Sequence, residues 1–203
     1  MKKRTAKKLR KIERMTRPQT AARLIVFDLE ATCWEPEEPE RVEILEIGAV
    51  DLGRCPAGGG PPDHGEFSEV VRPVTTSALG EFCLNLIPIS QVEADGADPF
   101  PIVFGRFVDW IGDGPFWLGS WGSFDRTQWT LECRRLGLAM PRGFAGHIDF
   151  RREFARWKRV RPPGLKAAME AAGLTMEGTT HRALDDARNL ARLARILLEQ
   201  TSS

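Results

Sequence analysis

Arg23-Leu-Ile-Val-Phe-Asp-Leu-Glu30 is a short, mostly apolar run that is rich in residues favouring β-structure. Such a run predicts a central strand that is buried on both faces. Residues two apart in a strand point to the same face, so Asp28 and Glu30 are expected side by side at its C-terminal end. Two buried carboxylates are costly unless a cation neutralises them, and hard oxygen ligands suit Mg²⁺ or Mn²⁺. The alternative is a solvated strand end where two acids flank a turn.

Two further strands are predicted beside this one, at residues 42–52 and 65–72. The segment between them, residues 55–63, is too rich in Gly and Pro for regular structure. Two strands joined by one loop favour an antiparallel hairpin next to the first strand.

The pattern changes near Phe100, where apolar residues begin to recur at helical spacing. Helices are predicted at 99–111, 124–136, 164–172 and 182–199, with short strands at 116–120 and 147–150. This order predicts an α/β fold in which helices pack on the faces of a mixed sheet.

Charge is distributed unevenly along the chain. The first 17 residues carry nine Lys or Arg and one acid, whereas the remainder is net acidic. We therefore expect a basic arm at residues 1–20, flexible or partly helical, before a folded domain at residues 21–203. The arm would attract phosphates through counterion release, or else serve only as a solubilising tail.

Several classes of protein are not expected from this composition. The sequence has no run of 18 apolar residues, so no membrane span is predicted. The basic N-terminus lacks the apolar region of a secretory signal. The four cysteines stand far apart without a CxxC pair, which favours reduced thiols in a cytoplasmic protein over structural zinc.

Helical periodicity predicts which of two adjacent acids faces the sheet. Asp186 is in register with an apolar stripe, formed by Leu190, Leu193 and Leu197. An unpaired charge is unfavourable there, so Asp186 is a candidate metal ligand. Asp185 falls on the polar face, where we expect a first-turn acid paired with Arg188 or Arg192.

Two more residues become candidates because of their neighbours. His181 precedes Asp186 by five residues, which makes it a plausible general base, although a lone loop histidine is usually structural or merely exposed. Ser123 is a good N-cap that places Asp125 in the first turn of the following helix. Asp125 is then either a helix-stabilising acid or the fourth carboxylate of a two-metal site.

Three ordered motifs link these residues to a known family: Phe27-Asp-Leu-Glu-Ala-Thr32, Trp121-Gly-Ser-Phe-Asp125 and His181-Arg-Ala-Leu-Asp-Asp186. With them the chain resembles the DEDDh 3′–5′ exonucleases, and most closely the branch of Eri-type and histone-mRNA 3′-end exoribonucleases. The resemblance covers about residues 23–198. It implies a ribonuclease H-like sandwich, with a mixed five-stranded sheet whose first three strands are antiparallel and helices on both faces.

The resemblance also implies roles for the acidic residues. Asp28, Glu30 and Asp186 would hold one divalent ion, and Asp28 with Asp125 a second. His181 would deprotonate the attacking water. The products would be 5′-mononucleotides released from a free 3′ end.

Substrate recognition is implied at the first motif. Ala31 and Thr32 would hold the terminal nucleotide, and Trp34 is a candidate stacking platform or a loop-packing residue. The branch commonly has Leu-Thr-Gly-Ile where this chain has Leu86-Ile-Pro-Ile89, a departure that bears on ribose recognition. The resemblance implies single-stranded RNA as the favoured substrate, while the departure keeps a DNA exonuclease of proofreading or repair type as the alternative. A non-catalytic binding module is a third reading.

Overall fold

The computed structural model describes residues 22–34, 42–54 and 65–200. The strands are β1 (Arg23–Ala31), β2 (Ile44–Arg54), β3 (Glu66–Arg72), β4 (Asp98–Pro99), β5 (Phe116–Ser120) and β6 (Phe144–Asp149). The helices are α2 (Glu81–Leu86), α3 (Gln91–Gly96), α4 (Phe100–Ile111), α5 (Phe124–Arg135), α6 (Phe150–Lys158), α7 (Leu165–Ala171) and α8 (Ala183–Gln200). The predicted basic arm and the predicted 55–63 loop lie outside the described residues.

The strands of the described chain form one mixed sheet in the order β4-β3-β2-β1-β5-β6. β1 pairs antiparallel with β2, and β2 with β3, as predicted. β5 lies parallel to both β1 and β6. The sheet has six strands rather than the expected five, because β4 adds two residues at the edge of β3. A two-residue strand leaves no periodicity in a sequence, so it could not be predicted.

The four predicted helices are confirmed as α4, α5, α7 and α8. The helices α2, α3 and α6, which have six, six and nine residues, were not predicted. The predicted strand at 147–150 was wrong at its end. Phe150 already begins α6, because the Asp149 side chain accepts the Arg152 N–H as an N-cap. None of the described helices is both long and apolar enough to cross a membrane.

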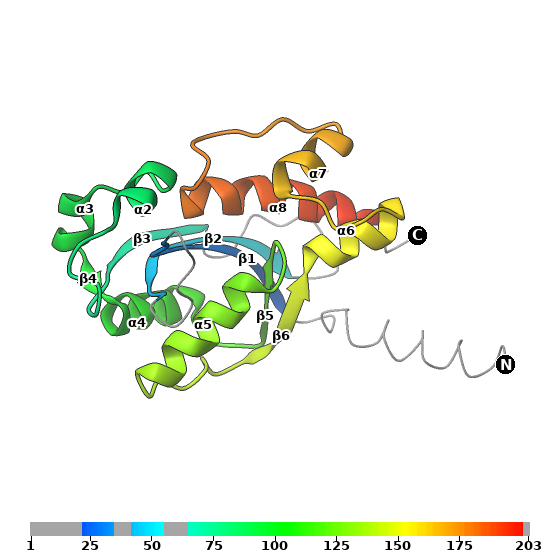
Figure 1. Ribbon diagram of the computed structural model, residues 1–203. Helices are drawn as coiled ribbons and strands as arrows, with labels where there is room; N and C mark the ends of the chain where they lie inside the picture. The colour runs from blue at the N-terminus through cyan, green and yellow to red at the C-terminus, as the bar shows by residue number, and fades with distance from the viewer. Residues whose placement is uncertain (1–21, 35–41, 55–64, 201–203) are drawn as a thin grey trace, which may run out of the picture.

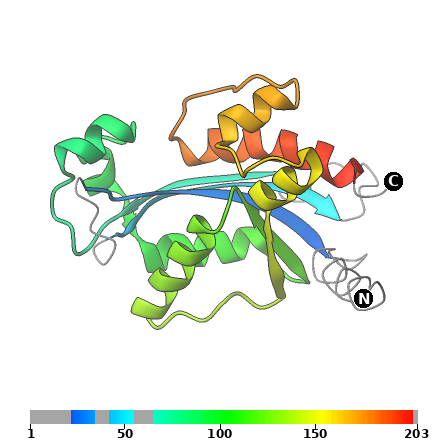
Figure 2. The same cartoon turned by 45° about the vertical axis from the view of Figure 1, so that its right-hand side comes forward.

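Alternation along β1 separates the molecule into two layers around the sheet (Figures 1 and 2). Leu24 and Val26 pack in the cluster formed with α6, α7 and α8. Ile25, Phe27 and Leu29 pack on the opposite face against α4 and α5. Asp28 and Glu30 continue the alternation of Leu24 and Val26, so both acids face the α8 side.

Gly48 of β2 allows α8 to begin directly on the sheet. It is the cross-strand partner of Asp28. A Cβ atom at this position would lie 2.1 Å from the Ala183 carbonyl carbon and from the Leu184 nitrogen. The first turn of α8 therefore approaches β2 closely beside the acids of β1, and only glycine leaves the space.

We predict that Gly48→Ala destabilises the protein, because the added methyl meets backbone atoms that cannot rotate away. Overpacking of this kind costs about 1–3 kcal/mol. Chemical denaturation would measure the change. Gly105→Ala in α4 is the matched control, since a Cβ there meets nothing within 4 Å, and alanine favours a helix. Equal stability of wild type and Gly48→Ala would contradict the close approach.

Candidate active site

A cleft of about 350 Å³ opens at the C-terminal end of β1. Its walls include all five residues for which chemistry was predicted, namely Asp28, Glu30, Asp125, His181 and Asp186. These residues come from β1, from the start of α5 and from the start of α8. The cleft thus lies where three segments that are distant in sequence meet.

Asp125 reaches the cleft because β5 separates from β1. The two strands pair as far as Val26 and Gly119, after which the chain turns into α5. The Leu29 N–H then donates to Asp125 Oδ1 at 3.2 Å. Ser123 occupies the N-cap position as predicted, but its side chain makes no cap hydrogen bond. Asp125, only 4% exposed, is therefore tied to β1.

His181 and Asp186 are held together at the start of α8. The His181 N–H donates to Asp186 Oδ2 at 3.0 Å, and His181 has a left-handed backbone with φ of 62°. His181 Nδ1 lies 3.9 Å from Glu30 Oε1. One ligand atom each from Glu30, His181 and Asp186 lie within 4.8 Å of one another, so these three residues form a group that could hold a metal ion.

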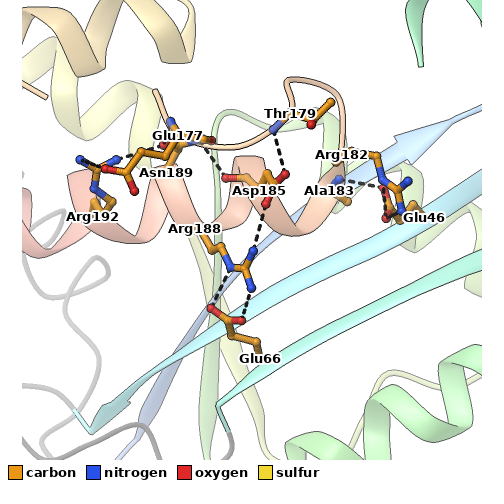
Figure 3. A network of polar contacts seen from close by, with 10 residues as sticks. All are labelled: Glu46, Glu66, Glu177, Thr179, Arg182, Ala183, Asp185, Arg188, Asn189 and Arg192. Atoms are coloured by element: carbon orange, nitrogen blue, oxygen red, sulfur yellow. Dashed lines mark hydrogen bonds and ion pairs between the residues drawn. The ribbon is translucent and has the colours of Figure 1, made fainter. Parts of the chain in front are cut away.

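Glu46 anchors the segment that carries His181 (Figure 3). Its carboxylate is fully buried and accepts Arg182 Nε at 3.1 Å and Arg182 Nη2 at 2.9 Å. It also accepts the Ala183 N–H at 2.8 Å. Glu46 is the cross-strand partner of Glu30, so one sheet face carries both the site and its anchor. The sequence signal was an acid inside the apolar run of β2, and it was missed.

Asp185 is not among the residues that line the cleft, which agrees with its predicted place on the polar face of the helix. Figure 3 shows it between Thr179 and Arg188. Its carboxylate accepts the Thr179 N–H at 2.8 Å and pairs with Arg188 at 3.0 Å. Arg192, the other predicted partner, pairs with Glu177 instead, at 2.9 Å. Asp185 therefore fastens the loop before α8 to the first turn of that helix.

The surroundings of the clustered acids disfavour their ionised forms. Burial raises the pKa of Glu30 to about 8, helped by repulsion from Asp186 and Glu46. Burial likewise raises the pKa of Asp28 well above its ordinary value, with Asp125 and Glu30 adding repulsion. Burial raises the pKa of Asp125 to about 6, although its hydrogen bonds oppose the shift.

The electrostatics that raise these pKa values also suit the four carboxylates to binding a cation. The four carboxylates supply hard oxygen donors, and their mutual repulsion is relieved when positive charge lies between them. Burial also raises the pKa of Asp186. The donor set and its electrostatics therefore fit a divalent metal ion.

The predicted substrate-binding residues do not line the cleft. Ala31 and Thr32 are buried. The Thr32 hydroxyl accepts the Glu43 N–H at 2.9 Å, which ties β1 to the residue before β2. Trp34 is half-buried beyond the end of β1 and is also absent from the cleft lining. Their contacts with a nucleotide remain a prediction.

Other cleft residues were missed by sequence reasoning. They come from the turn before α5 and its first residue, from α7 and from the loop before α8, and include Trp121, Phe124, Lys166, Met176 and Thr180. Trp121 and Phe124 belong to the second motif, but no role was predicted for them. The spacing of Lys166, Met176 and Thr180 gives no signal, because only the folded chain brings these segments to one place.

This fold, with acids from β1, α5 and α8 and a histidine around one cleft, defines a nuclease of the ribonuclease H-like, DEDDh class. The chain belongs to the exonuclease family, whose RNase_T model matches residues 25–194. It is 30% identical over 196 residues to the zebrafish (Danio rerio) ERI1 exoribonuclease 2, covering 86% of this chain and 35% of the relative. The chain therefore spans about a third of that relative's length.

Two other relatives are matched over most of their length. The 3′-5′ exonuclease Snipper of Drosophila melanogaster is 30% identical over 210 residues, which cover 93% of this chain and 73% of Snipper. The solved nuclease domain of 3′hExo, a DEDDh family member bound to rAMP, superposes with a TM-score of 0.80 at 28% identity. That match covers 91% of this chain and 95% of the domain.

We predict that Glu30→Gln stabilises the metal-free protein at pH 8. An ordinary glutamate ionises near pH 4.5, whereas folded Glu30 holds its proton to about pH 8. Stability of the metal-free wild type is therefore lost as pH rises through that window, and the glutamine variant escapes the loss. Thermal melts in chelator at pH 5 and pH 8 would show a gap that widens with pH.

Added Mg²⁺ or Mn²⁺ should raise the melting temperature of the wild type more than that of Glu30→Gln, since binding to the folded state stabilises it. Glu170→Gln, an exposed acid on α7, is the control and should follow the wild type. Identical melts for Glu30→Gln and wild type under all conditions would contradict the assigned electrostatics.

Proposed function

We propose that this protein is a metal-dependent 3′–5′ exonuclease that releases 5′-mononucleotides from single-stranded 3′ ends, with RNA favoured over DNA. The observation that carries the proposal is the convergence of Asp28, Glu30, Asp125, His181 and Asp186 on one cleft. Each of the four acids has a raised pKa for which a bound cation would compensate. Groups perturbed in this way and gathered in a cleft are typical of catalytic sites.

The carboxylates would hold two divalent ions, Mg²⁺ or Mn²⁺. Asp28, Glu30 and Asp186 are assigned to one ion, and Asp28 with Asp125 to the other. When bound, such ions make water a better nucleophile and offset charge on the attacking and leaving oxygens. The chain contributes orientation: the Leu29 N–H holds Asp125, and the His181 N–H holds Asp186.

His181 is the proposed general base. Its side chain is 44% exposed on the cleft wall, where water and substrate can reach it. The segment that carries this side chain is fixed, because the His181 N–H donates to Asp186 and the next residue, Arg182, donates to Glu46. An imidazole that water and substrate can reach is a common general base in hydrolytic sites.

The walls of the cleft suit a nucleotide chain. Phe124 is 55% exposed beside Asp125 and offers an aromatic face for a base. Lys166, on α7, supplies a positive charge that can contact a phosphate. We propose these two residues as substrate contacts in addition to Ala31, Thr32 and Trp34.

The preference for RNA is supported by the relatives. The zebrafish relative is named as an exoribonuclease, and the 3′hExo domain was solved with rAMP. One observation favours the DNA alternative. Ile87 and Ile89 are 4% and 2% exposed and pack in the core beneath α2 and α3, so this segment offers no hydroxyl to a sugar.

We predict that Asp28→Ala or Asp186→Ala lowers metal-dependent trimming of a 5′-labelled single strand by several orders of magnitude while the protein stays folded. Each change removes an oxygen donor that no neighbouring side chain replaces. Asp185→Asn is the adjacent control, since asparagine keeps a carbonyl for the Thr179 N–H. Activity near the wild-type level in either alanine variant would overturn the proposal.

Matched RNA and DNA oligomers in the same assay decide the substrate. Faster stepwise shortening of RNA from the 3′ end is expected. Equal or faster shortening of DNA would support the proofreading or repair reading. Tight binding of either oligomer by wild type without any cleavage would support a binding module.

We also predict that deleting residues 1–17 weakens substrate binding and flattens its salt dependence, while turnover at saturating substrate is kept. The nine basic residues of this segment would each release counterions on contacting phosphates. Binding measured at several salt concentrations checks this expectation. If the dependence of binding affinity on salt concentration is unchanged by the deletion, residues 1–17 are only a solubilising tail.

A further inference from the structure

His147 is a half-buried histidine outside the catalytic cleft. It lies on β6, and its neighbour Ser120 ends β5, the adjacent parallel strand. Ser120 is fully buried, and its Oγ lies 2.9 Å from His147 Nε2. The proposed chemistry uses neither residue.

Ser120 connects this histidine to the site. Its hydroxyl donates to the Gly122 carbonyl oxygen at 3.1 Å, and the same hydroxyl is a side-chain hydrogen-bond partner of the Asp125 carboxylate. A hydroxyl has one hydrogen to donate. A buried carboxylate is the stronger acceptor, because hydrogen bonds to ionised groups are stronger than those between neutral groups. With that hydrogen directed to Asp125, the Ser120 oxygen is free to accept from His147 Nε2–H.

The environment of His147 suits a fixed neutral donor. Burial lowers its pKa to about 4, with the nearby Arg126 adding to the shift. The ring stands edge-on to Phe27, with centroids 6.3 Å apart and planes at 86°. Phe27 directly precedes Asp28 in β1. The imidazole is thus oriented from one side by the strand that carries the first acid.

We propose that His147 and Ser120 are positioning residues for Asp125, acting through the chain His147 Nε2–H to Ser120 Oγ–H to the Asp125 carboxylate. This inference rests on the proposed function, in which Asp125 is a metal ligand. Asp125 Oδ1 already accepts the Leu29 N–H. A second donor from the other side would stop the carboxylate from rotating and present it to the cleft in one orientation. Partners that orient a ligand in this way typically change metal affinity or activity by about 10- to 100-fold.

The surroundings of His147 leave room for other side chains. His147 borders a second cavity of about 340 Å³ on the α5 side of the sheet, which is also lined by Met140. Side chains of similar or smaller volume than histidine can therefore be placed here without a clash. Met140→Ala changes the same cavity without touching the hydrogen-bond chain, and serves as the matched control.

The test compares Ser120→Ala, His147→Leu and His147→Gln with wild type and Met140→Ala. Mn²⁺ binding is followed by titration in the absence of substrate, and kcat and KM are measured separately. We expect Ser120→Ala and His147→Leu to weaken one Mn²⁺ site and to lower kcat, each by about 10-fold or more, with KM unchanged. Glutamine keeps an N–H near the position of Nε2, so His147→Gln should recover most of both losses. The double variant should be no worse than Ser120→Ala.

A spectroscopic measurement on the metal-free protein gives an independent reading. The chain has three histidines, so the ¹⁵N imidazole signals are easily assigned. His147 should show the neutral Nε2–H tautomer at pH 6–8, and its signal should shift in Ser120→Ala and in Asp125→Asn. An Nδ1–H tautomer would overturn the proposal.

Wild-type Mn²⁺ affinity in both Ser120→Ala and His147→Leu would also overturn it. Failure of the proposed function is a different result: wild type would not trim any nucleic acid, whereas the Mn²⁺ and tautomer measurements would still test the chain. Loss of activity in Met140→Ala equal to that in His147→Leu would reduce His147 to a packing residue.

Discussion

The structure depends on placing several carboxylates of like charge at the buried end of its central strand. Asp28 and Glu30 share the sheet face on which α8 begins, and Asp186 and Asp125 approach them from two other elements. Burial raises the pKa values of all four acids, and repulsion from other acids of the cluster adds to the shifts of Asp28 and Glu30. In a protein whose net stability is only about 5–15 kcal/mol, such a cluster persists because the surrounding fold is stable enough to hold it.

The fold provides that stability through the sheet beneath the site. The even-numbered residues of β1 before the acids pack against α8, and its odd-numbered residues pack against α4 and α5. Gly48 lets the first turn of α8 contact β2, and Glu46 binds the backbone and side chain at that turn. The start of α8 is therefore fixed by the absence of a side chain at Gly48 and by the ion pair between Arg182 and the buried Glu46. Asp186 and His181 take their positions from that arrangement.

Asp125 is held in a different way. It comes from α5, on the opposite layer, and enters the site where β5 turns away from β1. The Leu29 N–H and the Ser120 hydroxyl are its direct partners. The cleft thus combines ligands from both layers of the sandwich, which explains why its geometry is sensitive to contacts behind the sheet as well as within the cleft.

Local periodicity by itself determined the central strand, the antiparallel hairpin beside it, the helices α4, α5, α7 and α8, and the inward face of Asp186. Strand alternation and helical register are properties of the chain alone, and they survive folding because burial reinforces them. Asp125 was identified mainly through its motif, since an acid in a first helical turn has an ordinary explanation. The tertiary structure decided the sixth strand, the helices α2, α3 and α6, and the role of Glu46 as an anchor. It also decided that Trp121, Phe124 and Lys166 line the cleft. Their roles depend on which segments meet in space, and contacts between residues about 90 to 140 positions apart leave no periodic signal in a single sequence.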